Sequence, residues 1–401
     1  METGALWNSV FNRTEYLDKL WLNVGEFLPT VPDKSRTFGD FQNLEVCKSR
    51  IDQLTRDQER LRKSISKGIN DYELVSCISR KIVSSRAFYK LYEMVYKSVW
   101  IYEPHLSCLF LCEAPGGFID AITDMRRKRG MDTTWVTQSK CDESNIEFNE
   151  NITEERIIKI GNNDVTNSYC LNRTILEVKS KFPQGLDLIT ADGGIDIDEY
   201  NLQEIILTKL IFSEILIALC TQKKGGSFII KFYDMFSPST VKLFLLLVSL
   251  YKYVKIIKPN TSRVCNSERY VICNIYQPPD GFSHLLEDLL RLHKKWDTRA
   301  NSCSHLDFCP LWTPPQPLIT RLKNFNEKIL SKQINSINEC LRIIYGNDEY
   351  TKCIYFRLFF NKPRIHELLY NKVFFNHKIK KCLEWLRYHD IQTSRFFQTN
   401  Y

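Results

Sequence analysis

Between residues 108 and 276 the hydrophobic pattern switches repeatedly between short apolar runs and longer segments with apolar residues three or four positions apart. The first pattern is typical of buried strands and the second of amphipathic helices. The predicted strands are Cys108–Cys112, Thr134–Gln138, Arg156–Ile160, Leu186–Ala191, Ser227–Phe232, Val254–Lys258 and Tyr270–Tyr276. The predicted helices are Phe118–Arg129, Tyr169–Lys181, Tyr200–Gln222 and Pro238–Tyr251. This alternation predicts an α/β fold with a mostly parallel, seven-stranded sheet covered by helices on both faces, closed by an antiparallel hairpin of the last two strands.

Helical patterns flank this core on both sides. Phe41 to Ser66 is predicted to be an exposed amphipathic helix, and a second helical segment is predicted from about Asn70 to Val99. A group of prolines between residues 278 and 317 marks a linker-like region, beyond which Leu318 to Tyr401 is predicted to be helical. The predicted division of the chain is a helical N-terminal extension (1–80), a central α/β domain (81–279) and a mainly helical C-terminal region (280–401).

The segment Cys112–Phe118, which reads Cys-Glu-Ala-Pro-Gly-Gly-Phe, joins the first predicted strand to the first core helix. A strand that breaks at Pro-Gly-Gly and continues as a helix is typical of the start of a Rossmann-like unit. The glycines allow close approach of the backbone to a ligand, and the helix N-terminus presents free N–H groups. Alone, the same pattern is equally typical of a tight turn, so its functional meaning depends on the residues around it.

Composition narrows the class of protein. The chain has 401 residues, 43% of them hydrophobic and 25% charged, which is typical of a soluble globular protein. No apolar run is long enough to span a bilayer, so we expect no membrane partner. The net charge of +8 is compatible with a polyanionic partner without requiring one.

The 14 cysteines include no CxxC pair, which predicts reduced thiols and a cytoplasmic location, with the nucleus or a virion as alternatives. A cluster at Cys303, His305 and Cys309 offers only three zinc ligands at an unfamiliar spacing. Ordinary packing explains these residues better, so we expect no metal site. The bias toward Asn, Lys, Ile and Tyr suggests an AT-rich genome, with a viral origin as one interpretation.

Three polar residues stand at strand ends where an apolar strand should simply stop: Asp192, Lys231 and Glu268. Ligands of open α/β sheets bind beyond the carboxyl ends of the strands, so these side chains are predicted to face one crevice. Each also has an ordinary explanation, as a turn residue, an edge lysine or a surface charge. With Lys90, on a predicted helix, they make a set of two lysines and two acids.

With these residues the chain resembles the FtsJ-type ribose 2′-O-methyltransferases, which use a Lys-Asp-Lys-Glu tetrad. It is most similar to the Adrift-type cap methyltransferases and their relatives in large DNA viruses. The order of the matching runs is the same over roughly residues 80 to 277, which makes 81–279 the expected methyltransferase domain of Rossmann-like fold. The matching runs are Ser85–Leu91, Leu111–Ile119, Thr190–Gly194, Gly225–Phe232, Lys258–Arg263 and Asn266–Tyr270.

The resemblance implies a catalytic tetrad of Lys90, Asp192, Lys231 and Glu268. Lys231 is the expected base that takes the proton of a ribose 2′-hydroxyl, and Lys90 is expected to position the ribose. The two acids would orient the lysines. A lysine serves as a base at neutral pH only if its pKa falls; burial and a second cation lower it, and adjacent carboxylates oppose this.

The resemblance also implies S-adenosyl-L-methionine as cofactor, bound over the Pro-Gly-Gly turn. The expected binding residues are Glu113, Pro115, Gly116, Gly117, Phe118, Gln138, Asp164 and Asp192. For Asp164 the alternative is a helix cap ahead of Tyr169. Two departures from the common methyltransferase pattern leave the cofactor ribose contacts open: Phe110 stands where an acid often precedes the turn, and the second strand ends at Gln138 without an acid.

The function expected from this resemblance is methylation of the 2′-hydroxyl on the first or second transcribed nucleotide of capped mRNA. Its partners would be capped RNA and other capping or transcription proteins. Two alternatives remain: a ribosomal or transfer RNA 2′-O-methyltransferase, and a non-catalytic RNA-binding subunit of a capping or polymerase complex. The basic, aromatic segment Tyr355–Phe360 suits the second alternative, although a helical core with a charged outer face explains it better.

Overall fold

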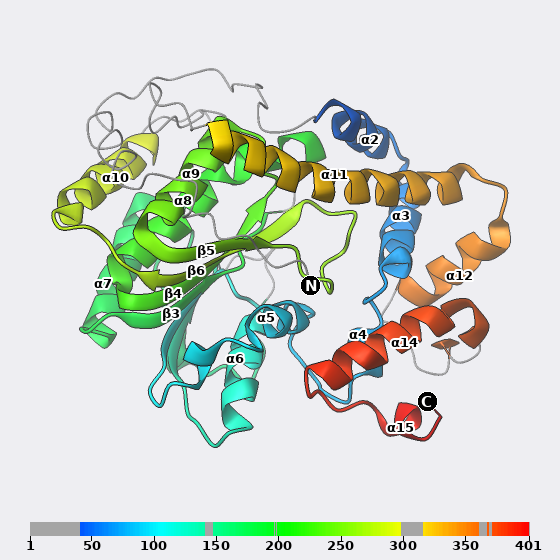
Figure 1. The fold of residues 1–401 in the computed structure, drawn as a ribbon, viewed down its shortest axis with the longest axis horizontal. Coiled ribbons are helices and arrows are strands. Elements are labelled where there is room, and N and C mark those ends of the chain that lie inside the picture. The colour runs from blue at the N-terminus through cyan, green and yellow to red at the C-terminus, as the bar shows by residue number, and fades with distance from the viewer. Residues whose placement is uncertain are drawn as a thin grey trace.

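A mixed sheet of six strands forms the centre of the computed structural model (Figure 1). The structure describes residues 41–140, 147–195, 197, 199–297, 316–360, 367–368 and 371–400. The strands are β1 (Ser107–Leu111), β2 (Thr134–Gln138), β3 (Leu186–Ala191), β4 (Gln222–Tyr233), β5 (Tyr251–Ile257) and β6 (Glu268–Tyr276), and their order is β2-β1-β3-β4-β6-β5. The strands β1 to β4 pair in parallel, whereas β6 is antiparallel to both β4 and β5. The α/β class and the terminal antiparallel hairpin are confirmed.

The predicted count of seven strands is wrong by one. Arg156–Ile160, expected as the third strand, makes a single parallel bridge between Thr137 and Ile157 beside β2. A short 3-10 helix, η3 (Glu154–Arg156), precedes it, and a turn with a positive φ of 55° at Gly161 follows. In the described residues the backbone of this run pairs with β2 only at Ile157 and Ile158, whose N–H donates to the Thr137 carbonyl oxygen at 2.8 Å.

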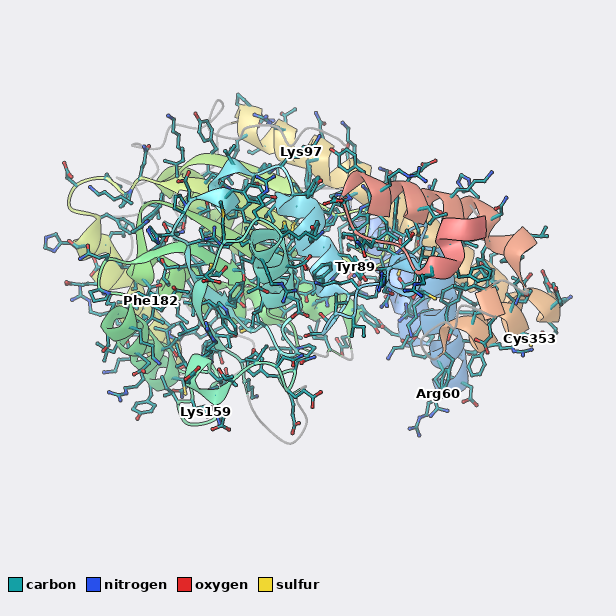
Figure 2. All side chains as sticks on the ribbon, turned by 90° about the horizontal axis from the view of Figure 1, so that it is seen from below. Arg60, Tyr89, Lys97, Lys159, Phe182 and Cys353 are labelled. Carbon is teal, nitrogen blue, oxygen red and sulfur yellow. The ribbon has the colours of Figure 1, made fainter. Side chains whose placement is uncertain are left out.

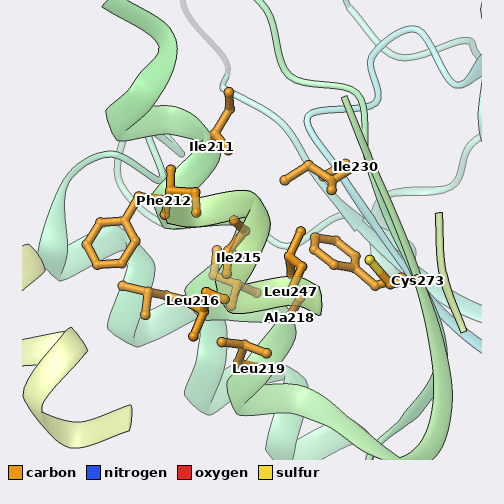
Figure 3. Packing of buried hydrophobic residues seen from close by; sticks show 14 of the residues in the cluster. Ile211, Phe212, Ile215, Leu216, Ala218, Leu219, Ile230, Leu247 and Cys273 are labelled. Atoms are coloured by element: carbon orange, nitrogen blue, oxygen red, sulfur yellow. The ribbon is translucent and has the colours of Figure 1, made fainter. Parts of the chain in front are cut away.

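Helices cover both faces of the sheet, as the alternating pattern predicts. The core helices are α6 (Gly117–Arg127), α7 (Ser168–Lys181), α8 (Gln203–Thr221) and α9 (Pro238–Leu250). One hydrophobic cluster joins α7, α8, α9 and one face of the sheet, and a second joins α6 and the other face. Figure 3 shows α8 in the first cluster, where Ile215 and Leu216 pack near Leu247 of α9. Helix α8 is buried almost all round, which explains its continuous apolar sequence.

The flanks are helical in their described parts, but their helices are shorter than predicted. The N-terminal pattern splits into α2 (Gln42–Asp52) and α3 (Arg56–Ile69), because Thr55 and Gln58 form a capping box that starts a new helix. The next segment splits into α4 (Val75–Ile78), α5 (Ala87–Val95) and the 3-10 helix η2 (Val99–Tyr102). The C-terminal helices are α10 (Phe282–Asp297), α11 (Gln316–Tyr345), α12 (Glu349–Phe359), α14 (Lys372–Tyr388) and α15 (Arg395–Asn400).

The two flanks pack against the core and against each other. Helix α10 packs in the same cluster as α7 and α8, and the long α11 runs from the side of α9 toward α2 and α3 (Figure 1). Tyr89 of α5, which Figure 2 shows near the junction with the C-terminal helices, contacts Trp385 of α14 at 6.0 Å between ring centroids. The predicted boundaries of the three regions stay a prediction. No helix in the described ranges combines the length and apolarity that crossing a membrane requires.

Truncation of the α8 core should measure how much the fold depends on this helix. We expect Ile215→Ala, at a fully buried position, to lower the free energy of unfolding by about 2–5 kcal/mol, because it removes apolar contacts and leaves a cavity. Leu176→Ala, at an exposed position of α7, should change it by less than about 0.5 kcal/mol. Urea unfolding of both variants tests this, and equal losses would contradict it.

Candidate active site

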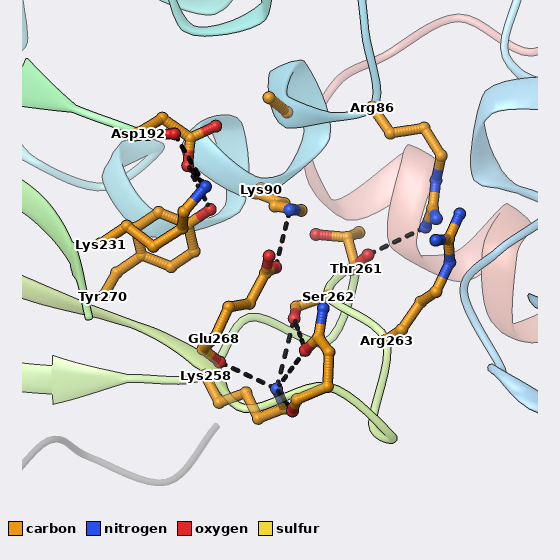
Figure 4. A network of polar contacts seen from close by, with 12 residues as sticks. Arg86, Lys90, Asp192, Lys231, Lys258, Thr261, Ser262, Arg263, Glu268 and Tyr270 are labelled. Carbon is orange, nitrogen blue, oxygen red and sulfur yellow. Dashed lines mark hydrogen bonds and ion pairs between the residues drawn. The ribbon is translucent and has the colours of Figure 1, made fainter. Parts of the chain in front are cut away.

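Four charged side chains from distant parts of the sequence meet at one edge of the sheet (Figure 4). Asp192 directly follows β3, and Lys231 lies near the end of the parallel strand β4. Glu268 opens β6, which runs the opposite way, and its Cα pairs with Tyr233 at the end of β4. Lys90 reaches the same place from α5. The topology therefore brings together all four residues that the sequence singled out.

The four side chains form two ion pairs. Lys231 Nζ lies 3.1 Å from Asp192 Oδ1 and also donates to the Asp192 carbonyl oxygen at 2.7 Å. Lys90 Nζ lies 2.6 Å from Glu268 Oε1. Each of the four side chains is largely buried, so solvent screens the pairs weakly.

The Glu268 carboxylate is surrounded by positive charge. Burial alone would raise its pKa, but the ammonium groups of Lys90, Lys231 and Lys258 outweigh burial and hold the pKa below its ordinary value. Glu268 is therefore ionised at neutral pH, and it balances the lysines around it.

The pKa of Lys231 departs from the sequence expectation that it is lowered. Burial does lower it, but the Asp192 carboxylate, the Tyr233 hydroxyl and the Glu268 carboxylate raise the pKa well above its ordinary value. Of the two opposing effects, the charges of the neighbouring acids prevail. Lys231 is an ammonium group in this arrangement at neutral pH.

Two site residues escaped the sequence reasoning. The fully buried Tyr270 donates its hydroxyl hydrogen to Asp192 Oδ1 at 2.8 Å, so Asp192 is held by both Tyr270 and Lys231. Glu214 of α8 accepts a hydrogen bond from the backbone N–H of Gly193 at 3.2 Å. Burial, the largest effect on this carboxyl group, raises its pKa to about 8. An acid within the apolar run Leu210–Leu219 was the available signal for Glu214, whereas Tyr270 looks like any core tyrosine.

A third lysine supports the backbone of Glu268. Lys258 Nζ donates to the carbonyl oxygen of Glu268 at 2.9 Å and to the carbonyl and side-chain oxygens of Asn266, both at 2.8 Å. These contacts close the loop between β5 and β6 onto itself (Figure 4). Lys258 is the last residue of the predicted strand Val254–Lys258. The sequence alone did not indicate that it holds the backbone of Glu268.

Two carboxylates tie the same loop to the helices beside it. Glu73 binds Arg86 at 2.5 Å and Arg263 at 3.0 Å. Glu93 of α5 accepts hydrogen bonds from the backbone N–H groups of Asn260 and Thr261, at 2.8 and 3.1 Å. The loop before Glu268 is thus held against α5, which carries Lys90.

The Pro-Gly-Gly turn has the backbone that its glycines predict. Gly116 has a φ of 112°, which favours glycine, and Gly117 begins α6. A Cβ on Gly117 would lie 2.2 Å from Ser85 Oγ and 2.9 Å from the Ala87 Cβ, so no side chain fits there. The turn therefore packs directly against the start of α5, beside Lys90.

Buried acceptors without partners lie next to this turn. Glu113 Oε2 accepts the backbone N–H of Phe118 at 3.2 Å, but Glu113 Oε1 has no hydrogen-bond partner among the described residues. Burial, with Asp192 nearby, raises the pKa of Glu113 well above its ordinary value. Gln138 Nε2 donates to the Asn163 carbonyl oxygen, and its Oε1 is likewise without a partner in the described part of the chain.

The remaining predicted cofactor residues fall into different environments. Pro115 accepts the backbone N–H of Asn149 at 3.0 Å through its carbonyl oxygen. Phe118 is fully buried and packs against Tyr270, the residue that donates to Asp192. Asp164 Oδ1 accepts both the N–H and the hydroxyl of Thr166, and the cap of α7 is Asn167. The alternative that Asp164 caps this helix is therefore wrong.

These features fit S-adenosylmethionine by their chemistry. The cofactor brings hydrogen-bond donors on its ribose, its adenine and its amino group, and the unpaired oxygens of Glu113 and Gln138 are acceptors. The space beside Gly116 and Gly117 is filled by Ile152 and by Ser85 and Ala87, so these glycines fix the turn against its neighbours and the fit rests on the unpaired oxygens. The Cys303–Cys309 cluster considered for zinc lies outside the described residues.

The profile of FtsJ-like methyltransferases matches residues 83–276, the segment that holds the tetrad and the turn. Residues 83–276 form an FtsJ-like methyltransferase domain. The resemblance expected from the sequence motifs is thereby confirmed, with the methyltransferase fold. The individual roles of the tetrad and cofactor residues stay predictions.

Curated proteins similar to the chain are named cap-specific mRNA (nucleoside-2′-O-)-methyltransferases. The cap-specific mRNA (nucleoside-2′-O-)-methyltransferase 2 of Danio rerio is 29% identical over 250 residues, which are 59% of this chain and 33% of that protein. The corresponding methyltransferase 1 of Dictyostelium discoideum is 32% identical over 205 residues, or 45% of this chain and 27% of its own length. The mouse methyltransferase 1 is 28% identical over 282 residues, or 63% and 33%. The chain thus spans about a third or less of the length of these relatives.

The pKa of Lys258 gives a test of the site's electrostatics. Burial is the largest effect and lowers this pKa to about 8, although the Glu268 carboxylate raises it. Between pH 8 and 10 Lys258 is therefore still protonated in the unfolded chain but has lost its proton in the folded chain. The free energy of unfolding then rises with pH because of this lysine, by at most about 1.4 kcal/mol per pH unit. The free energy of unfolding of the native protein minus that of Lys258→Met should rise over this range. A difference that stays flat or falls would contradict the assignment.

Proposed function

We propose that the chain is an S-adenosylmethionine-dependent mRNA cap ribose 2′-O-methyltransferase, acting on the first or second transcribed nucleotide. The observation that carries the proposal is the assembly of Lys90, Asp192, Lys231 and Glu268 into two buried ion pairs beside a glycine turn. The cap-specific names of the relatives favour a capped substrate over ribosomal or transfer RNA. An intact tetrad argues against a purely non-catalytic subunit.

The proposed chemistry uses Lys231 as the general base. S-adenosylmethionine, when bound, supplies an activated methyl group and the positive charge of its sulfonium. Positive charge beside an ammonium lowers its pKa, which opposes the effect of Asp192 and brings proton loss from Lys231 closer to neutral pH. Neutral Lys231 then takes the proton of the 2′-hydroxyl, while Lys90 positions the ribose and the carboxylates of Asp192 and Glu268 keep the two amines in place.

The cofactor is proposed to lie over the turn at Pro115, Gly116 and Gly117. Glu113 and Gln138 each have an oxygen without a hydrogen-bond partner in the described residues. These two oxygens are candidates for the contacts with the cofactor ribose, because the acids that often make these contacts are absent at Phe110 and after Gln138. Asp164 already accepts the Thr166 hydroxyl and lies 3.5 Å from Lys140 Nζ through its other oxygen. A contact between Asp164 and the adenine amine would use that second oxygen.

Methyl transfer to defined RNAs tests the proposed activity. Labelled S-adenosylmethionine would be offered with three short RNAs: uncapped, capped without ribose methylation, and capped with the first ribose already methylated. We expect label on a ribose next to the cap, and a loss of at least about 100-fold in Lys231→Ala because the proton acceptor is gone. The control Lys224→Ala removes an exposed lysine from the other end of β4 and should retain activity. Label confined to internal ribose of uncapped RNA would overturn the cap assignment.

The pH dependence of the reaction tests the base. Because the pKa of Lys231 is raised, the reactive neutral form is a minority at neutral pH, and log kcat should rise with pH by up to about one unit per pH unit. Single-turnover rates on capped RNA measure this directly. A profile that is flat from neutral to alkaline pH, with unchanged rates in Lys231→Met, would remove Lys231 from the base role.

A further inference from the structure

A buried network of charges lies just beyond the catalytic ends of β4 and β6. It contains Lys48, Asp234, Arg269 and Asn326, each exposing 4% or less of its surface. Asp234 comes three residues after Lys231, and Arg269 directly follows Glu268. The network is therefore joined through the backbone to both catalytic strands.

The two strand ends are locked together within this network. The backbone N–H of Asp234 donates to the carbonyl oxygen of Ser267 at 3.2 Å, and Asp234 has a positive φ of 51°. Arg269 Nη2 lies 3.6 Å from Asp234 Oδ1, across the pair of strands. A shift of either side chain would move the backbone next to Lys231 or Glu268.

The two remaining members come from the flanks of the chain. Lys48 Nζ, on α2, lies 2.9 Å from Asp234 Oδ2. Asn326, on α11, accepts from Arg269 Nη1 at 2.7 Å and donates to the carbonyl oxygen of Met235 at 2.9 Å. Helices from opposite ends of the sequence thus hold the same two strand ends.

A hydrophobic cluster surrounds these charges. The ring of Phe236, two residues after Asp234, lies 5.1 Å from that of Phe41. The buried members of the cluster are Phe41, Leu44, Cys47, Ile51, Phe236, Leu330, Ile337 and Leu341. They come from α2, α11 and the segment after β4, and they exclude water from the ion pairs, which strengthens them.

Stability alone does not account for charges at this place. A buried ion pair is often no more stabilising than apolar residues of similar volume, because desolvation offsets the attraction. Charged pairs do restrict the geometry of the groups they join, since each lone pair and proton needs its partner in place. Here the groups so restricted are the backbones beside Lys231 and Glu268.

We propose that α2 and α11 are working parts of the active site, with Lys48 and Asn326 as positioning residues that keep Lys231 and Glu268 in register. The inference rests on the proposed function and deepens it. The segment 83–276 contains the tetrad but neither Lys48 nor Asn326, so it needs both flanks for full activity.

Lys48→Met in the full chain tests the α2 side. We expect kcat on capped RNA to fall about 10- to 100-fold, as for a displaced catalytic group, while the affinity for S-adenosylhomocysteine stays unchanged. The control Arg50→Met changes an exposed residue of the same helix and should be silent. The alkaline rise of the pH–rate profile should also move to lower pH, because a displaced Glu268 no longer raises the pKa of Lys231.

Asn326→Leu tests the same network from α11, with the exposed Asn324→Leu as its control. It should lower kcat and shift the pH profile in the same direction as Lys48→Met. Full activity in both network variants, or a loss of kcat that only follows the unfolded fraction with no shift in pH profile, would overturn the proposal.

Hydrogen exchange separates this inference from the proposed function. In both network variants the amides around residues 231–236 and 266–271 should exchange faster, with those of α6 unchanged. If the wild-type chain methylates no capped RNA while this local loosening occurs, the cap function fails and the positioning network stands. If exchange is uniform across the chain, the network is only a general stabiliser and the inference fails.

Discussion

The antiparallel pairing of β6 with β4 is the constraint on which the site depends. It places Glu268 opposite Tyr233, two residues from Lys231, although the loop before β6 and the whole of α9 and β5 separate them in sequence. The parallel neighbour β3 brings Asp192 to the same edge. Because Glu268 is the first residue of β6, the ion pair between Lys90 and Glu268 depends on the position of β6 between β4 and β5.

Charge balance follows from that geometry. Two ion pairs and Lys258 share one partly buried space, so each ionisation state depends on the others. The carboxylates hold the pKa of Lys231 above its ordinary value, so this lysine carries a positive charge beside them. Burial alone would lower the pKa of Lys231 and raise that of Glu268, and the neighbouring charges reverse both shifts.

The flanking helices extend this dependence outward. Lys48 and Asn326 reach Asp234, three residues after Lys231, and Arg269, which directly follows Glu268. The hydrogen bonds from Lys48 to Asp234 and between Asn326 and Arg269 couple the packing of α2 and α11 to the ends of β4 and β6. This gives the two terminal regions a role in the FtsJ-like domain that does not require them to touch RNA.

The alternation of strands and helices, the glycine turn and the tetrad can all be predicted from the amino-acid sequence. These features come from local periodicity and from short motifs, in which neighbouring residues carry the information. The structure adds that Arg156–Ile160 makes a single bridge to β2 in place of a strand, that Lys231 is held protonated and that Lys48 meets Asp234. Strand pairing, pKa values and buried networks depend on groups far apart in the chain, and no local pattern records which of them come within a few ångströms.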